Sequence, residues 1–89
     1  MRVIQVKQPG SPDELVVAQQ AAPQPKSDEL LIEVAYAGIN RPDIIQRQGF
    51  YPPPEGASPL LGLEVSGRVR ALGSEVQGWQ VGDRVCALT

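Results

Sequence analysis

The 89-residue sequence has no histidine and a single cysteine, Cys86. Histidine is the usual side chain for general-base work near neutral pH and the commonest metal ligand. Tetrahedral zinc sites are built from Cys, His and carboxylate ligands. One thiol and ten carboxylates are poor material for such a site, and one cysteine cannot form an internal disulfide. The composition therefore argues against zinc hydrolases, histidine-dependent triads and a disulfide scaffold.

Long apolar runs and clusters of positive charge are missing too. No stretch approaches the ~20 apolar residues needed to cross a bilayer, and the N-terminus MRVIQVKQPG lacks the apolar core of a signal peptide. Eight basic against ten acidic residues give a net charge of -2, with no Lys/Arg block. Nucleic-acid capture needs such a block. We therefore expect a cytoplasmic chain with neither a membrane nor a nucleic-acid partner.

The length allows one small domain, which buries only about 60% of its unfolded surface. Alternating apolar and polar residues, bounded by Gly and Pro, predict short strands. They fall at residues 1–7, 14–19, 29–39 and 63–72, and residues 79–88 show a turn around Gly82 and Asp83 followed by a strand. In residues 29–39 we expect Tyr36 to point to the core, and Cys86 to be a small core residue. The pattern predicts a mainly antiparallel β domain.

A short helix is predicted between the third and fourth strands. Asn40 is a favourable N-cap residue, Pro42 suits a first turn, Asp43 suits the N3 position, and Gly49 marks the end. Asp43 is expected to do no more than pair weakly with arginines on the helix surface, at ~0.3 to 0.5 kcal/mol a pair. Three consecutive prolines stiffen the loop that follows, and Tyr51 stands at its start.

Four segments in chain order carry a family resemblance, and together they span most of the sequence. They are residues 37–43 (AGINRPD), 46–56 (QRQGFYPPPEG), 61–67 (LGLEVSG) and 81–85 (VGDRV). The chain thereby resembles the N-terminal part of a zinc-free NAD(P)H quinone oxidoreductase of the p53-inducible type, in the medium-chain dehydrogenase/reductase superfamily. In the zinc alcohol dehydrogenases of the same superfamily, the position matching Asn40 is a cysteine that binds zinc, and the position matching Leu63 is a histidine that binds zinc. Both ligands are absent here, so the resemblance implies chemistry without zinc.

The resemblance implies a mainly β, GroES-like catalytic domain with a short helix, of which residues 1–89 are an incomplete part. A Rossmann domain is expected C-terminal to it, since the Gly-x-Gly-x-x-Gly fingerprint does not occur in this chain. The implied cofactor is NADPH, the implied substrate is quinone-like, and the full-length protein is expected to be a homo-oligomer. The 89 residues alone are predicted to be inactive.

Asn40 and Tyr51 are the candidate catalytic and cofactor-binding residues, by their match to the family pattern. The competing interpretations are a plain helix cap for Asn40 and an ordinary loop aromatic for Tyr51. Glu64 is a weaker candidate, because a carboxylate on an exposed strand face is usually only solvated. Ile45 stands where crystallin-type quinone reductases typically have a tyrosine, which predicts a less polar pocket.

Two other functions remain open at this stage. An enoyl-thioester reductase of the same superfamily would share the zinc-free cleft, and activity on an enoyl thioester but not on quinones would identify it. A non-catalytic GroES-like binding module rests on fold analogy alone. A natural stop codon after Thr89 would favour that module.

Overall fold

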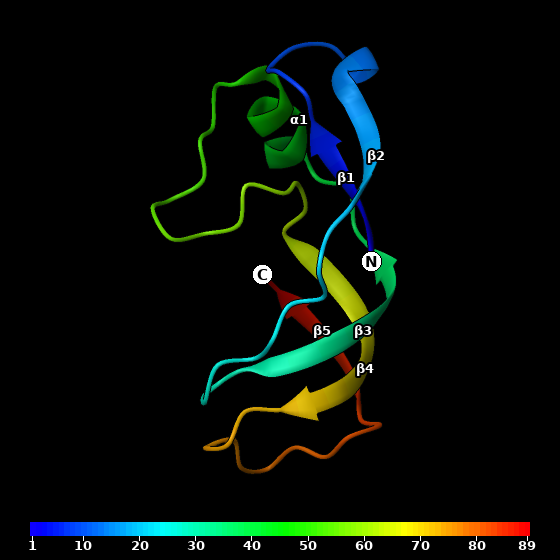
Figure 1. The fold of residues 1–89 in the computed structure, drawn as a ribbon, viewed down its shortest axis with the longest axis vertical. Coiled ribbons are helices and arrows are strands. Elements are labelled where there is room, and N and C mark those ends of the chain that lie inside the picture. The colour runs from blue at the N-terminus through cyan, green and yellow to red at the C-terminus, as the bar shows by residue number, and fades with distance from the viewer. The chain divides into compact units, whose positions relative to one another are not determined.

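The structure is a computed structural model that describes residues 1–89, and these residues form two compact units (Figure 1). The first unit consists of Met1–Ala21 and Ile39–Leu63, and the second of Ala22–Gly38 and Glu64–Thr89. Each unit therefore joins two stretches of chain that are distant in sequence.

The first unit contains a two-stranded hairpin and the one α-helix. Strand β1 (Arg2–Val6) pairs antiparallel with β2 (Leu15–Gln19), and a turn of 3-10 helix (Pro12–Glu14) precedes β2. Helix α1 (Arg41–Gln48) belongs to the same unit. The strands and the helix predicted for these regions are confirmed.

The second unit is a three-stranded antiparallel sheet. Its strands are β3 (Leu30–Ala37), β4 (Glu64–Leu72) and β5 (Arg84–Leu88), with β4 in the centre (Figure 1). Val69 on β4 is only 2% exposed and is the most deeply buried apolar side chain of the chain. The predicted alternation along β4 is confirmed, because Val69 is buried while its neighbours Arg68 and Arg70 are exposed.

The prediction that Tyr36 lies in the core is wrong, because its side chain is 78% exposed. The pairing of β3 with β4 shifts register between Val34 and Tyr36. Val34 lies opposite Gly67 and Tyr36 opposite the adjacent residue Ser66, so the two side chains point to opposite faces of the sheet. Val34 on the other face is 50% exposed as well, so residues 33–37 of β3 are exposed on both faces, and the pattern of apolar residues alone does not reveal this.

The expectation that Cys86 is a buried core residue is also wrong, since Cys86 is exposed. It lies on β5, the edge strand, directly opposite Ser66. Its neighbours Val85 and Ala87 are half-buried on the other face. Cys86 therefore shares the open face of the sheet with Tyr36, which is also paired with Ser66.

The fold is mainly β with one short helix, and all of its strand pairs are antiparallel, as predicted. None of its helical segments combines the length and the apolar character that crossing a bilayer requires.

Candidate functional site

Helix α1 positions the two candidate residues of the first unit. Asn40 is its N-cap, with an extended backbone at φ -132° and ψ 160°, and Pro42 occupies the first turn. Gly49 ends the helix with a left-handed backbone at φ 91°, which a residue with a side chain adopts only with strain. The start and stop signals of the sequence thus place Asn40 at one end of α1 and the Tyr51 loop at the other.

Asn40 and Asp43 face each other in a capping-box arrangement. The Asn40 N–H donates to Oδ2 of Asp43 at 2.9 Å, while the Asp43 N–H donates to the main-chain carbonyl of Asn40 at 3.0 Å. The side chain of the half-buried Asn40 makes no cap hydrogen bond of its own, so its amide NH₂ group is not used at the start of the helix. The structure therefore allows Asn40 to serve the helix and still donate a hydrogen bond elsewhere.

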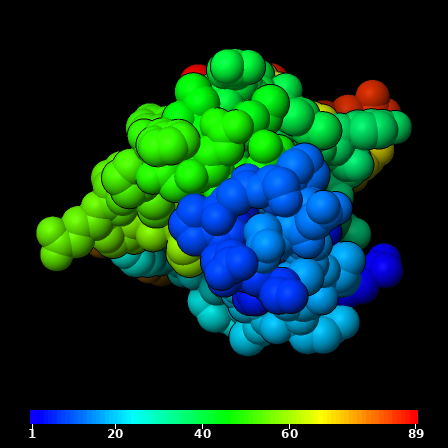
Figure 2. All heavy atoms as spheres, turned by 90° about the horizontal axis from the view of Figure 1, so that it is seen from above, coloured from blue at the N-terminus to red at the C-terminus, as the bar shows by residue number.

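Tyr51 stands on the loop that follows α1. Its side chain is 48% exposed, and Phe50 beside it is 81% exposed. Figure 2 shows this stretch, in yellow-green, reaching outward from the green helix region that lies against the blue N-terminal hairpin. The phenol of Tyr51 is thus partly packed and partly open to an incoming molecule.

The structure brings Asn40 and Tyr51 into the same unit but not to the same end of α1. Eight helical residues span about 12 Å at 1.5 Å per residue. The two residues would therefore contact different parts of a bound molecule, or two molecules lying side by side.

The hairpin fixes the C-terminal half of α1 through Gly10. The Gly10 N–H donates to the carbonyl of Arg47 at 2.9 Å, and Nε of Arg47 donates to the carbonyl of Gly10 at 3.0 Å. Arg47 is therefore engaged with main-chain groups. Asp43, likewise expected on the helix surface, is instead only 8% exposed and also accepts from the Gly62 N–H at 3.2 Å.

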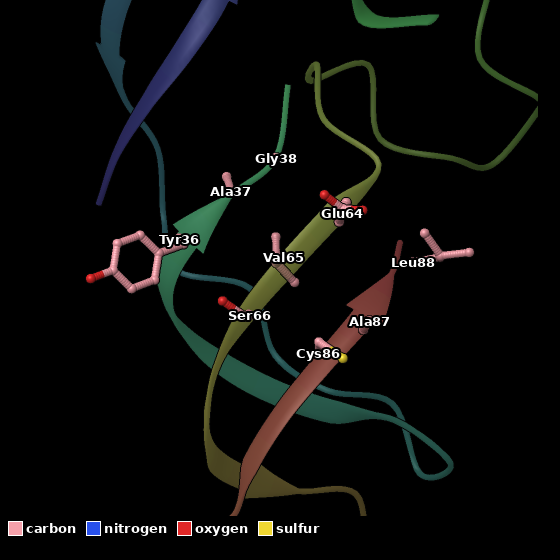
Figure 3. Close-up of a pocket in the computed structure, with 9 residues that line it drawn as sticks. All are labelled: Tyr36, Ala37, Gly38, Glu64, Val65, Ser66, Cys86, Ala87 and Leu88. Carbon is pink, nitrogen blue, oxygen red and sulfur yellow. The ribbon is translucent and has the colours of Figure 1, made fainter. Parts of the chain in front are cut away.

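A hollow of about 460 Å³ lies on the sheet of the second unit (Figure 3), and its lining includes neither Asn40 nor Tyr51. Glu64 supplies its one carboxylate, and an added Cβ at Gly38 would overlap the Glu64 side chain. Tyr36, Ser66 and Cys86 form one row across the three strands. No group of three or more His, Cys, Asp or Glu side chains is placed to hold a metal ion.

Comparison with known proteins adds a family match. The model of the alcohol dehydrogenase GroES-like domain matches residues 26–89, which is most of the chain.

Curated relatives cover nearly the whole chain. The chain is 40% identical over 84 residues to part of a phenolphthiocerol/phthiocerol polyketide synthase of Mycobacterium tuberculosis. It is 39% identical over 88 residues to a probable quinone oxidoreductase of Schizosaccharomyces pombe. These matches cover 94% and 98% of the chain but only 4% and 26% of the two relatives.

Solved structures of oxidoreductases also match nearly the whole chain. The Escherichia coli quinone oxidoreductase complexed with NADPH matches 100% of the chain at 34% identity with a TM-score of 0.89. The CurK enoyl reductase matches 96% of the chain at 28% identity with a TM-score of 0.82. The chain spans 27% and 28% of these two structures, about a quarter of their length.

Proposed function

Because this chain belongs to the alcohol dehydrogenase GroES-like family of medium-chain oxidoreductases, we propose that it is the first part of the catalytic domain of an NADPH-dependent quinone oxidoreductase. The finer assignment is the p53-inducible type, acting without zinc. The observation that carries it is the whole-chain similarity to a quinone oxidoreductase complexed with NADPH. The QRQG and YPPP segments around Tyr51 support the subtype.

The candidate residues fit a nicotinamide and quinone site. Asn40 offers an amide NH₂ group that its cap does not use, and Tyr51 offers a phenol that is 48% exposed. Both are uncharged donors, which suits an oxygen that gains negative charge during the reaction. No residue of this chain forms a dinucleotide fingerprint, so the Rossmann domain predicted C-terminal to it would hold the phosphates.

The protein's task in this reaction is to bind and orient. When bound, NADPH supplies the hydride, and a proton completes the hydroquinone. Asn40 would donate to the quinone oxygen as charge builds on it, and Tyr51 would orient the quinone or the nicotinamide with little rotamer entropy to lose. We also keep the expectations of a cytoplasmic homo-oligomer as part of this proposal.

The test is NADPH oxidation by the complete protein with a small quinone, with and without a zinc chelator. Asn40→Ser keeps the main-chain bond to Asp43 but replaces the amide donor by a shorter hydroxyl donor, so we expect kcat/KM to fall ~10- to 100-fold with little loss of stability. Tyr51→Phe should also lower kcat/KM. Tyr36→Phe is the matched control, because Tyr36 is an exposed tyrosine of the second unit. Unchanged rates in both site variants would refute the two assignments.

A second candidate is an enoyl-thioester reductase, favoured by the similarity to the CurK enoyl reductase. Quinones and enoyl thioesters are both conjugated carbonyl compounds, so the same donors at Asn40 and Tyr51 would serve either substrate. Competing the two substrates at equal concentration separates the candidates. Turnover of the thioester alone would replace the quinone assignment.

A further inference from the structure

The loop that carries Tyr51 is fastened to α1 at both of its ends. At its start, the Gly49 N–H donates to the Gln46 carbonyl and the Phe50 N–H to the Ile45 carbonyl, each at 3.0 Å. At its end, Nε2 of Gln46 donates to the carbonyl of Pro59 at 3.2 Å. Both ends of the loop are therefore fixed to the helix by hydrogen bonds.

The almost fully buried carboxylate of Asp43 links the start of the helix to the chain just beyond the loop. Its Oδ1 accepts from the Gly62 N–H at 3.2 Å, just beyond the loop. Its Oδ2 accepts from the Asn40 N–H at 2.9 Å, at the start of the helix. The side chain is only 8% exposed. A buried carboxylate is tolerated when its oxygens are hydrogen-bonded, so both amides matter to this arrangement.

Helix capping accounts for only one of the two hydrogen bonds that the Asp43 carboxylate accepts. A capping-box acid at N3 needs one oxygen, which reaches back to the N-cap N–H. The second oxygen of Asp43 instead holds Gly62, a residue outside the helix. Asp83 in the second unit shows the simpler case, because one of its oxygens accepts from the nearby Gln80 N–H at 2.9 Å.

We propose that Asp43 is a positioning residue that fixes the Asn40 main chain and the return of the Tyr51 loop through a single carboxylate. It would act on the reaction through these two residues without touching the substrate. This inference rests on the proposed reductase function. It goes further by assigning a role to a residue outside the pair that the family resemblance identifies.

The test uses the complete protein with Asp43→Ala and Asp43→Asn. Asn keeps one acceptor oxygen and so retains one of the two bonds, while Ala removes both. We expect faster hydrogen exchange at the Asn40 and Gly62 amides, in Asp43→Ala more than in Asp43→Asn. We expect kcat/KM to fall ~10- to 100-fold in Asp43→Ala, because small displacements of positioning groups cost rates of that size, with partial recovery in Asp43→Asn.

A double-mutant cycle distinguishes positioning from general stability. In an Asn40→Ala, Tyr51→Phe background, Asp43→Asn should have less than a threefold effect, because residues that act through one another are not additive. Asp83→Ala is the control: it removes one carboxylate–amide bond in the second unit and should show no coupling to the pair. If Asp43→Ala fails to fold, Asp43→Asn carries both measurements.

The outcomes are separable. Unchanged amide exchange at Asn40 and Gly62 would show that the Asp43 carboxylate does not hold these two main-chain amides in place. Faster exchange together with an undiminished kinetic effect in the Asn40→Ala, Tyr51→Phe background would overturn the positioning role while leaving the reductase assignment intact. If the unchanged protein oxidises NADPH with neither a quinone nor an enoyl thioester, the proposed function fails, and the positioning role fails with it.

Discussion

The sheet of the second unit is held by ladders of main-chain hydrogen bonds between neighbouring strands, whereas around α1 the first unit depends on single side chains. Asp43, Gln46 and Arg47 each bond main-chain groups of a distant segment there. A ladder uses groups that every residue except proline carries, so it tolerates side-chain changes on its open face. The region with both candidate residues has fewer such regular bonds, and a few specific side chains determine its geometry.

The largest loss of stability is expected from truncating the side chain of Val69, which tests whether the two units differ in this way. Its side chain is 2% exposed in the second unit, so Val69→Ala should cost roughly 2 kcal/mol of stability. Hydrogen exchange should then accelerate across β3, β4 and β5. Val81→Ala is the control, since Val81 is 64% exposed. If the amides of the first unit accelerate to the same degree, the two units unfold as one cooperative body and the contrast fails.

The next prediction concerns the loss of stability caused by a substitution at Gly49, which ends α1. Gly49 has φ 91°, and an added Cβ would lie 2.9 Å from Cβ of Pro9. Gly49→Ala should cost about 1 to 2 kcal/mol from the left-handed backbone, plus the cost of displacing Pro9. We expect faster exchange in α1 and in the loop after it.

Gly56 supplies the matched comparison for that prediction. It has a similar φ of 83°, but nothing lies within 4 Å of an added Cβ. Gly56→Ala should therefore report the backbone strain alone. Equal losses in the two variants would mean that Pro9 moves aside without cost.

Local signals made α1 predictable from sequence. Asn40, Pro42 and Gly49 act on the residues next to them, and the helix bounds agree with them. The GroES-like fold class was likewise predicted from four short segments and is confirmed by the family match.

The errors arose where the partner is distant in sequence. Tyr36 lies where residues 33–37 of β3 are exposed on both faces of the sheet, and the second bond of Asp43 depends on Gly62. A linear pattern of apolar and polar residues contains neither fact. Whether Asn40 and Tyr51 contact the reactants stays a prediction, because it concerns bound molecules.

The smallest effect concerns charge on the open face of the sheet. Arg68 lies directly opposite Arg84 on β5 and opposite Glu33 on β3. Like charges directly opposite each other destabilise a strand pair, and opposite charges stabilise it by about 0.2 to 1 kcal/mol. Arg84→Glu should therefore slow exchange of the β5 amides, and Arg84→Gln should slow it by less. Both gains should shrink in 1 M salt, which screens exposed charges. A gain for Arg84→Glu that does not change with salt would show that the ladder, rather than the charge pair, sets the stability of this edge.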